Sequence, residues 1–191
     1  MTTRNPDGST NVAPMGPHCL DTQLEQFELR PFQTSTTFTN LQNTREGILH
    51  ITDDVLLFAH AALDSLPDSI QLAPGECVAC DYLADACRVL EFTCHHIDTS
   101  HERAVVHCRT VCHSRIRDFF GFNRAKHAVI EASILATRLD FLPASVVREK
   151  FVDLRNIVSK TGGEREIRAF QFLLDYVNSS SETAATRHGS A

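Results

Sequence analysis

Residues 29–54, LRPFQTSTTFTNLQNTREGILHITDD, contain a loop, a helix and a strand in close succession. The helix is predicted over about residues 37–45, and Gly47 stands where the end of a helix favours a left-handed residue. A strand is predicted over residues 47–52, because apolar and polar side chains alternate there. The segment therefore predicts a loop–helix–strand unit, which ends in a turn at two aspartates.

The loop before this helix is rich in hydrogen-bond donors. A helix N-terminus presents unpaired backbone N–H groups and a partial positive charge. Hydroxyls and a guanidinium added to it suit a phosphate or another anion. Serine and threonine are also ordinary N-caps, so the pattern alone leaves a purely structural role open. The candidate residues are Arg30, Thr34, Ser35, Thr36, Thr37 and, in the first turn, Asn40.

Length and charge exclude several classes of protein. The 191 residues suit one domain, or one domain with an added subdomain. The formal net charge of -6 argues against a nucleic-acid partner, which needs a basic surface. We find no apolar run that would span a membrane and no apolar signal segment in MTTRNPDGST. The seven cysteines are therefore expected to be reduced thiols in a cytoplasmic protein.

The N-terminal region predicts a hairpin with one short strand. Residues 4–9, RNPDGS, form a turn in which proline, aspartate and glycine each have a conformational role. The strand after it covers residues 10–15 and places Asn11, Ala13 and Met15 on one face. Only residues 1–4 are available for the strand before this turn, so the first strand is expected to be truncated and the true start to lie upstream.

The remainder divides into strands followed by helices. Strands are predicted over residues 23–29, 88–97 and 103–117, and helices over 55–63, 124–139, 145–160 and 164–178. Ala125, Val129, Ala132 and Ala136 form a small-residue stripe, which implies that another element packs closely against it. Ile167 and Phe170 are expected to face inward on the last helix.

This order predicts an α+β fold with an antiparallel sheet. The β-rich domain covers residues 1–118, the helical subdomain covers 119–178, and the polar tail 179–191 is expected to be disordered.

Two further sets of residues could carry chemistry. Cys77 and Cys80 have the C-x-x-C spacing of a metal site, but no second matched pair follows, so we assign no metal ligand. Cys108 and Cys112 share a strand parity with Val106, which favours an apolar role. Arg124 and Lys126 stand at a helix start, where positive charge is unfavourable unless an anion is near.

Three stretches together carry a family resemblance: NVAPMG at residues 11–16, LRPF with the hydroxyl cluster that follows it, and GFNRAKHAVIEA at residues 121–132. They resemble the domain of unknown function 447 family, and more broadly flavin-reductase-like proteins. The resemblance implies a split β-barrel that binds FMN, a C-terminal helical part, and a homodimer with the flavin near its interface.

The family pattern also implies positions for the cofactor. The FMN phosphate would lie at Arg30 and the hydroxyl run, close to Asn40. The isoalloxazine ring would lie along Asn11, Ala13 and Met15, and Arg124 and Lys126 would be weaker candidates for phosphate or substrate contacts. If the protein is an enzyme, the resemblance implies an FMN-dependent oxidoreductase, with a family-level link to pterin-dependent one-carbon metabolism. A flavin-binding protein without turnover and a zinc-stabilised interaction module remain alternatives.

Overall fold

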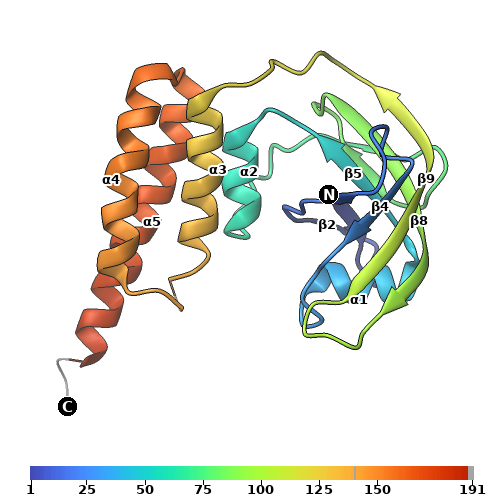
Figure 1. Ribbon diagram of the computed structural model, residues 1–191, viewed down its shortest axis with the longest axis horizontal. Coiled ribbons are helices and arrows are strands. Elements are labelled where there is room, and N and C mark those ends of the chain that lie inside the picture. The colour runs from blue at the N-terminus through green and yellow to red at the C-terminus, as the bar shows by residue number, and fades with distance from the viewer. Residues whose placement is uncertain (140, 189–191) are drawn as a thin grey trace. The chain divides into compact units, whose positions relative to one another are not determined.

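Seven antiparallel strands form one sheet in the computed structural model, which describes residues 1–139 and 141–188 (Figure 1). Their order across the sheet is β2-β1-β5-β8-β9-β4-β3. These strands are β1 (Thr2–Arg4), β2 (Thr10–Val12), β3 (His18–Cys19), β4 (Gln26–Leu29), β5 (Glu46–Ile51), β8 (Arg88–Asp98) and β9 (Val105–Arg115). A separate hairpin pairs β6 (Leu72–Pro74) with β7 (Asp81–Leu83). The predicted α+β class with an antiparallel sheet is confirmed.

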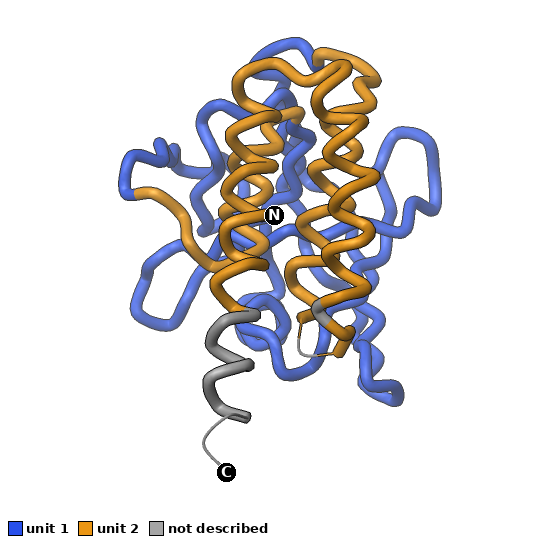
Figure 2. Tube along the Cα trace, turned by 90° about the vertical axis from the view of Figure 1, so that its left-hand side faces the viewer, with its two compact units in different colours: residues 1–52, 68–119 blue, residues 53–67, 120–191 orange. Residues whose placement is uncertain are grey.

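The described chain has five helices in two compact units, which Figure 2 colours separately. They are α1 (Thr36–Thr44), α2 (Val55–Ala62), α3 (Arg124–Ala136), α4 (Ala144–Thr161) and α5 (Glu164–His188). Unit 1 comprises residues 1–52 and 68–119 and holds the sheet, the hairpin and α1; unit 2 comprises residues 53–67 and those from 120 onward. No described helix is long and apolar enough to cross a bilayer.

The division differs from the predicted boundary at residue 118 in one respect. The segment 53–67, with α2, belongs to the helical unit and not to the β-rich part. Val55 and Ala59 of α2 are buried in the same apolar cluster as residues of α3, α4 and α5. The cause is tertiary packing, which a linear division of the sequence does not reveal.

The small-residue stripe of α3 lies at the centre of unit 2, as predicted. Ala125, Val129 and Ala132 are fully buried, and Ala136 is nearly so. Short side chains allow neighbouring helices to approach closely, and α3 contacts α2, α4 and α5. The stripe therefore forms the common contact surface of the four helices in unit 2.

The helix α5 buries a different face at its N-terminal end from the one predicted, and it is longer than predicted. Ile167 is 52% exposed, while Glu166 is 7% exposed. The Glu166 carboxylate accepts the Gly163 N–H at 2.8 Å and pairs with Lys126 at 3.0 Å, which turns Glu166 inward. The helix continues to His188, so residues 179–188 of the expected disordered tail are helical, and residues 189–191 lie outside the described chain.

The first strand is short but present. Thr2, Thr3 and Arg4 of β1 pair with β2, and Thr2 also pairs with Ile48 of β5. Met1 extends the hairpin, because its N–H group donates to Ala13 O at 2.8 Å and its carbonyl accepts the Ala13 N–H at 3.0 Å. β1 is therefore an interior strand of the sheet despite having three residues.

Gly47 does not end the helix α1. The left-handed residue at the end of α1 is Arg45, with φ of 58°, and Gly47 lies within β5. A Cβ atom at Gly47 would lie 2.7 Å from the Phe92 ring and 3.1 Å from Thr2 O. The glycine is therefore needed because β5 passes directly against Phe92 in the core of unit 1.

A buried carboxylate holds the loop between β6 and β7. Glu91 of β8 is 3% exposed and accepts three backbone N–H groups, from Glu76 at 2.9 Å, Cys77 at 2.6 Å and Val78 at 2.9 Å. Hydrogen bonds from several N–H groups stabilise a carboxylate that has lost its water. Glu91 therefore fixes this loop against the sheet.

We expect Glu91→Gln to lower the free energy of unfolding by about 2–4 kcal/mol, because the neutral amide replaces one acceptor oxygen by a donor that faces N–H groups. The measurement is equilibrium denaturation in urea. Glu102→Gln is the matched control, since Glu102 is exposed and should change stability by less than about 0.5 kcal/mol. A Glu91→Gln variant as stable as the parent would contradict this role.

Candidate functional site

The hydroxyl run forms the N-terminal end of α1. Ser35 is the N-cap: its Oγ accepts the Phe38 N–H at 3.1 Å and donates to Phe32 O at 2.7 Å. Phe38 is buried in the core of unit 1 and anchors the first turn. The hydroxyl of Ser35 is thus used in capping, as serine commonly is.

Two hydroxyls of the run remain available to a ligand. Thr34 and Thr36 are exposed and form no side-chain hydrogen bond within the described residues. Thr36 and Thr37 are the first two residues of α1, and N–H groups at these positions have no carbonyl partner inside a helix. This end of α1 therefore offers two free hydroxyls and unpaired N–H groups to an anion.

The structure joins the predicted ring-binding strand to the hydroxyl run. The Asn11 side-chain amide donates to Thr37 Oγ1 at 3.1 Å and to Thr3 Oγ1 at 3.0 Å. The Asn40 amide donates to the same Thr3 oxygen at 3.1 Å and to Asn5 Oδ1 at 2.7 Å. Asn11, Thr37 and Asn40 were all predicted site residues, and one network of hydrogen bonds connects them.

Burial within this network limits which of the three residues can contact a ligand. Thr37 is 3% exposed and Asn40 is 1% exposed, so both are interior supports. Asn11 is half-buried, as are Ala13 and Met15. Met15 packs against the core of unit 1, and Ala13 pairs with Met1 through its backbone. β2 ends at Val12, before the predicted end at Met15, and partial exposure leaves β2 and the segment after it accessible.

Arg30 is occupied by an acidic neighbour. Its Nη2 lies 3.1 Å from Glu28 Oε2, and its side chain is 55% exposed. Glu28 also faces His18 and His107, with 3.6 Å between each ring Nδ1 and a carboxylate oxygen. A phosphate contact from Arg30 therefore stays a prediction, and it would require the guanidinium to exchange partners.

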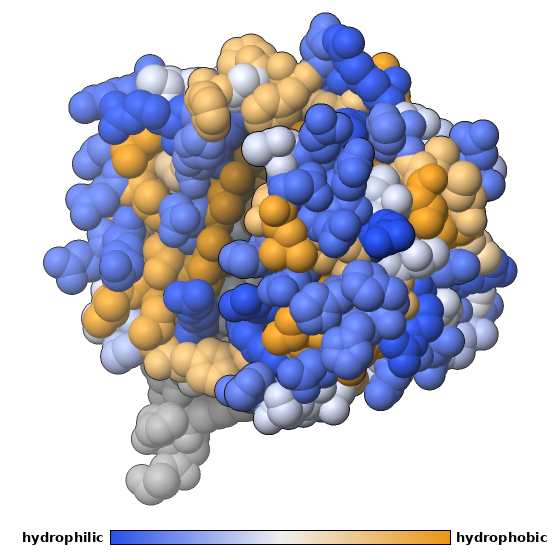
Figure 3. Space-filling model, turned by 45° about the vertical axis from the view of Figure 1, so that its right-hand side comes forward, coloured by the Kyte–Doolittle hydropathy of each residue, from blue (hydrophilic) through white to orange (hydrophobic). Residues whose placement is uncertain are grey.

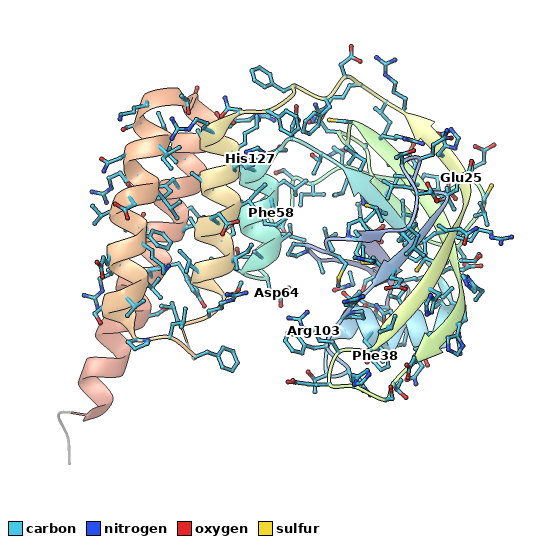
Figure 4. The ribbon with its side chains drawn as sticks, in the orientation of Figure 1. Glu25, Phe38, Phe58, Asp64, Arg103 and His127 are labelled. Atoms are coloured by element: carbon cyan, nitrogen blue, oxygen red, sulfur yellow. The ribbon has the colours of Figure 1, made fainter. Side chains whose placement is uncertain are left out.

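Arg103 was not predicted, and it lies against the loop that precedes α1. Its guanidinium stacks 3.6 Å from the centroid of the Phe32 ring, and its Nη1 donates to Arg30 O at 3.0 Å. Arg103 lies at the tip of the β8–β9 hairpin. Gln33 holds this tip by donating to Thr99 O at 3.0 Å and His101 O at 2.6 Å. Figure 4 shows Arg103 at the same end of unit 1 as Phe38 of α1. No local sequence signal connects these segments, because they are far apart along the chain.

Arg124 and Lys126 belong to unit 2, where Lys126 has an internal partner. Its Nζ lies 3.0 Å from Glu166 Oε1 and donates to Asp53 O at 2.6 Å. Burial alone would raise the pKa of the Glu166 carboxyl, but hydrogen bonds from Lys126 and Gly163 outweigh it and hold that pKa below its usual value. Arg124 is exposed. A role for either residue in ligand binding remains a prediction.

Within the described residues, no three His, Cys, Asp or Glu side chains are grouped so that they could hold a metal ion. Cys77 is exposed, while Cys80 is buried with its Sγ 3.6 Å from Thr2 Oγ1. Cys108 is buried beside Cys94, but Cys112 pairs with Glu91. A β-bulge shifts the register between Glu91 and Phe92, so the predicted shared face of Cys108 and Cys112 is wrong.

Comparison with solved structures defines the class of fold. A flavin reductase, HpaC, crystallised with NADP⁺, has 16% sequence identity and a TM-score of 0.51, over 64% of this chain and 79% of that chain. The 2-nitrobenzoate 2-nitroreductase NbaA of Pseudomonas fluorescens has 15% identity and a TM-score of 0.50, over 60% and 61%. The fold of this chain is therefore flavin-reductase-like, with a helical part at the C-terminal end.

The family is narrower than the fold. Residues 1–117 match the N-terminal domain model of the protein of unknown function DUF447, and residues 123–175 match a second DUF447 model. The chain belongs to the DUF447 family. An FMN-bound DUF447 protein from Methanosarcina mazei, MM1853, has 22% identity and a TM-score of 0.77, over 92% of this chain and 91% of that chain.

His50 of β5 is a half-buried histidine of unit 1 whose ionisation the fold suppresses. Its Nε2 accepts the Leu83 N–H at 3.1 Å, and its Nδ1 is buried without a partner in the described structure. Burial, with a smaller contribution from the N-terminal charge, lowers the pKa of His50 to about 2. The ring is therefore neutral at physiological pH, and it supports β7 through its hydrogen bond to Leu83.

Because the pKa of His50 is lower in the folded protein than in the unfolded chain, acid should destabilise the fold. Below the unfolded value of about 6.5 the unfolded state takes up a proton that the folded state does not, and this costs about 2 kcal/mol by pH 5. We expect His50→Gln to flatten the stability profile between pH 7 and pH 5 in urea denaturation. His95→Gln, an exposed control, should leave the slope unchanged. An unaltered slope in His50→Gln would refute this assignment.

Proposed function

We propose that this chain is a flavoprotein that binds FMN and transfers hydride or electrons through it. The supporting observation is the N-terminal end of α1, which offers two free threonine hydroxyls and unpaired N–H groups to an anion, in a fold shared with an FMN-bound member of the family. The flavin reductase and the nitroreductase of the same fold support the class of reaction. The proposal names a cofactor and a type of chemistry, and leaves the substrate open.

The phosphate of FMN would be held by the hydroxyl run. Thr34 and Thr36 supply hydroxyl donors, and the first N–H groups of α1 supply backbone donors. Arg103 is the guanidinium already fixed against the loop before α1, whereas Arg30 pairs with Glu28. We therefore assign the cationic contact first to Arg103 and keep Arg30 as a second candidate.

The isoalloxazine ring would lie along Asn11, Ala13 and Met15. The hydrogen bond from Asn11 to Thr37 fixes the distance between this strand and the phosphate end of the site. Bound FMN supplies the hydride or electron transfer itself, and the protein supplies position and exclusion of water. We assign no proton-transfer residue. His50, whose ionisation is suppressed, supports β7 from inside unit 1 and is not available for this role.

The remaining parts of the proposal rest on the family resemblance. They are a cytoplasmic homodimer with the flavin near its interface, contacts to phosphate or substrate from Arg124 and Lys126, and a substrate in pterin-dependent one-carbon metabolism. Lys126 would have to leave Glu166 to take part, which costs the buried carboxylate its charged partner. Arg124 is therefore the stronger candidate of the two.

A flavin-binding protein without turnover is the second candidate. The same contacts to the phosphate and the ring would hold a flavin in a sensor or carrier as well as in an enzyme. A zinc-stabilised module would need further ligands beside Cys77, and elemental analysis of the purified protein would detect the metal.

The visible spectrum of the freshly purified protein tests the cofactor. We expect a yellow protein with flavin absorption, from which FMN is released on denaturation. Colourless protein that also fails to bind added FMN would refute the proposal. Bleaching of the flavin band by NADH or NADPH under anaerobic conditions distinguishes an oxidoreductase from a carrier, which would keep its colour.

The phosphate site is tested by comparing FMN with riboflavin. Hydrogen bonds to a charged group contribute about 1.5–3 kcal/mol each, so FMN should bind at least about a hundredfold more tightly than riboflavin. Thr36→Ala and Arg103→Ala should each weaken FMN binding about tenfold and leave riboflavin almost unchanged.

Thr39→Ala is the matched control for this experiment, because Thr39 lies in the same helix and its hydroxyl bonds to Ser35 O. It should bind both ligands as the parent does. Arg30→Ala tests the second candidate in the same assay. Equal affinity for FMN and riboflavin would mean that the end of α1 does not hold the phosphate.

A further inference from the structure

Two of the seven cysteines meet on one face of the sheet in unit 1. Cys77 lies in the loop between β6 and β7, and Cys112 lies in β9. Glu91 of β8 is the cross-strand partner of Cys112, so these two side chains project from the same face of the sheet. The Glu91 carboxylate accepts the Cys77 N–H at 2.6 Å, which places the loop on that face. The loop and the Cys112 side chain are therefore neighbours.

The Cys112 thiol contacts the side chains of this loop. Its Sγ donates to Glu76 Oε2 at 3.7 Å, and Glu76 is the chain neighbour of Cys77. A hydrogen bond with the Cys77 thiol is the main cause that raises the pKa of the Cys112 thiol to about 11, with burial and nearby negative charge as smaller causes. The two sulfur atoms are therefore within reach of each other, which a disulfide requires.

The C-x-x-C spacing suggests Cys80 as the partner of Cys77, but the fold directs Cys80 elsewhere. Cys80 is buried, and its Sγ lies 3.6 Å from both Thr2 Oγ1 and Asp81 O. Burial is the main cause that raises the pKa of the Cys80 thiol above its usual value. The sulfur that the tertiary structure brings to Cys77 therefore comes from β9 and not from the same loop.

Access to solvent distinguishes this pair from a second cysteine pair of unit 1. Cys77 is exposed and Cys112 is partly exposed. Cys94 and Cys108 are cross-strand partners with 4.0 Å between their Sγ atoms, but both are buried. Figure 3 brings forward the side of unit 1 that carries β8 and β9, and the surface there is mostly hydrophilic with small separate hydrophobic groups. A small water-soluble oxidant can therefore reach the first pair, whereas the core excludes it from the second.

We propose that Cys77 and Cys112 are a peroxide-sensitive thiol pair that oxidises to an intramolecular disulfide. Hydrogen peroxide converts the exposed Cys77 thiol to a sulfenic acid, while the O–O bond breaks and one water leaves. The Cys112 sulfur then attacks the Cys77 sulfur, so that the S–S bond forms and the S–O bond breaks. The Cys112 proton leaves with the hydroxide as a second water, and a dithiol reverses the oxidation.

The disulfide would hold the β6–β7 loop to β9 by a covalent bond, where hydrogen bonds to Glu91 hold it in the reduced protein. Neither cysteine is assigned to the flavin site, so the proposal does not rest on FMN binding. A colourless protein that forms this bridge would refute the proposed cofactor and leave the thiol pair intact.

The test is mass spectrometry of the full chain, purified in reducing buffer, desalted and treated with an equimolar amount of hydrogen peroxide. Free thiols are then blocked with iodoacetamide in denaturant, and the protein is digested without reduction. We expect two peptides joined through Cys77 and Cys112, lighter by two hydrogen atoms than their sum, and separated by dithiothreitol. Cys94 and Cys108 should carry the blocking group, because burial protects them in the folded protein.

Cys80→Ser and Cys19→Ser are the matched controls. Cys80 completes the C-x-x-C spacing, and Cys19 is an exposed thiol in β3. Both variants should form the bridge with a yield within about twofold of the parent, whereas Cys77→Ser and Cys112→Ser should lose it. Because the joined peptides are measured in the parent itself, the test does not depend on the folding of any variant.

Three results would overturn the proposal. They are the absence of the joined peptides from the peroxide-treated parent, a bridge between Cys77 and Cys80 as the main product, and dimers linked through Cys19 in place of the internal bridge.

Discussion

A group of buried amides and hydroxyls joins the first hairpin to α1, and the candidate flavin site depends on it. Thr3 Oγ1 accepts from both Asn11 and Asn40, and Asn11 also reaches Thr37. Buried polar groups are stable only when they are hydrogen-bonded, so each member constrains the position of the others. β2 and the start of α1 are therefore held in a fixed relative position, which binding of a ligand across both of them requires.

Local patterns in the sequence were sufficient for the class of fold and for the start of α1. The hydroxyl run, the alternation in β5 and the small-residue stripe of α3 are short-range signals, and each led to the correct element. The end of α1 was correct to within one residue, but the role of Gly47 was wrong, because Arg45 is the left-handed residue and glycine is needed in β5 by the closeness of the Phe92 ring. The predicted inward orientation of Ile167 was wrong because Glu166 turns inward to contact Lys126 and Gly163, and this ion pair outweighed the apolar pattern.

The site residues that could not be predicted are those that come from distant segments. Arg103 reaches the loop before α1 from the tip of the β8–β9 hairpin, which is far from that loop along the chain. Conversely, Arg30 stood next to the hydroxyl run in sequence, but its side chain turns to Glu28. Proximity along the chain identified the N-terminal end of α1 correctly, whereas the partners of long charged side chains depend on tertiary contacts.

The bulge in β9 has a consequence for the length of that strand. Two register shifts interrupt the β8–β9 ladder, and the one at Val111 places Cys112 opposite Glu91 where strict alternation would place a core residue. Val111 has no partner on β8, so its removal would leave Thr110 opposite Phe92 and Cys112 opposite Glu91, with residues 112–115 on the same faces. Removal of a paired residue of β9 would instead exchange the faces of the residues beyond it. At this strand the loss of Val111 should therefore disturb the sheet less than the loss of a paired neighbour.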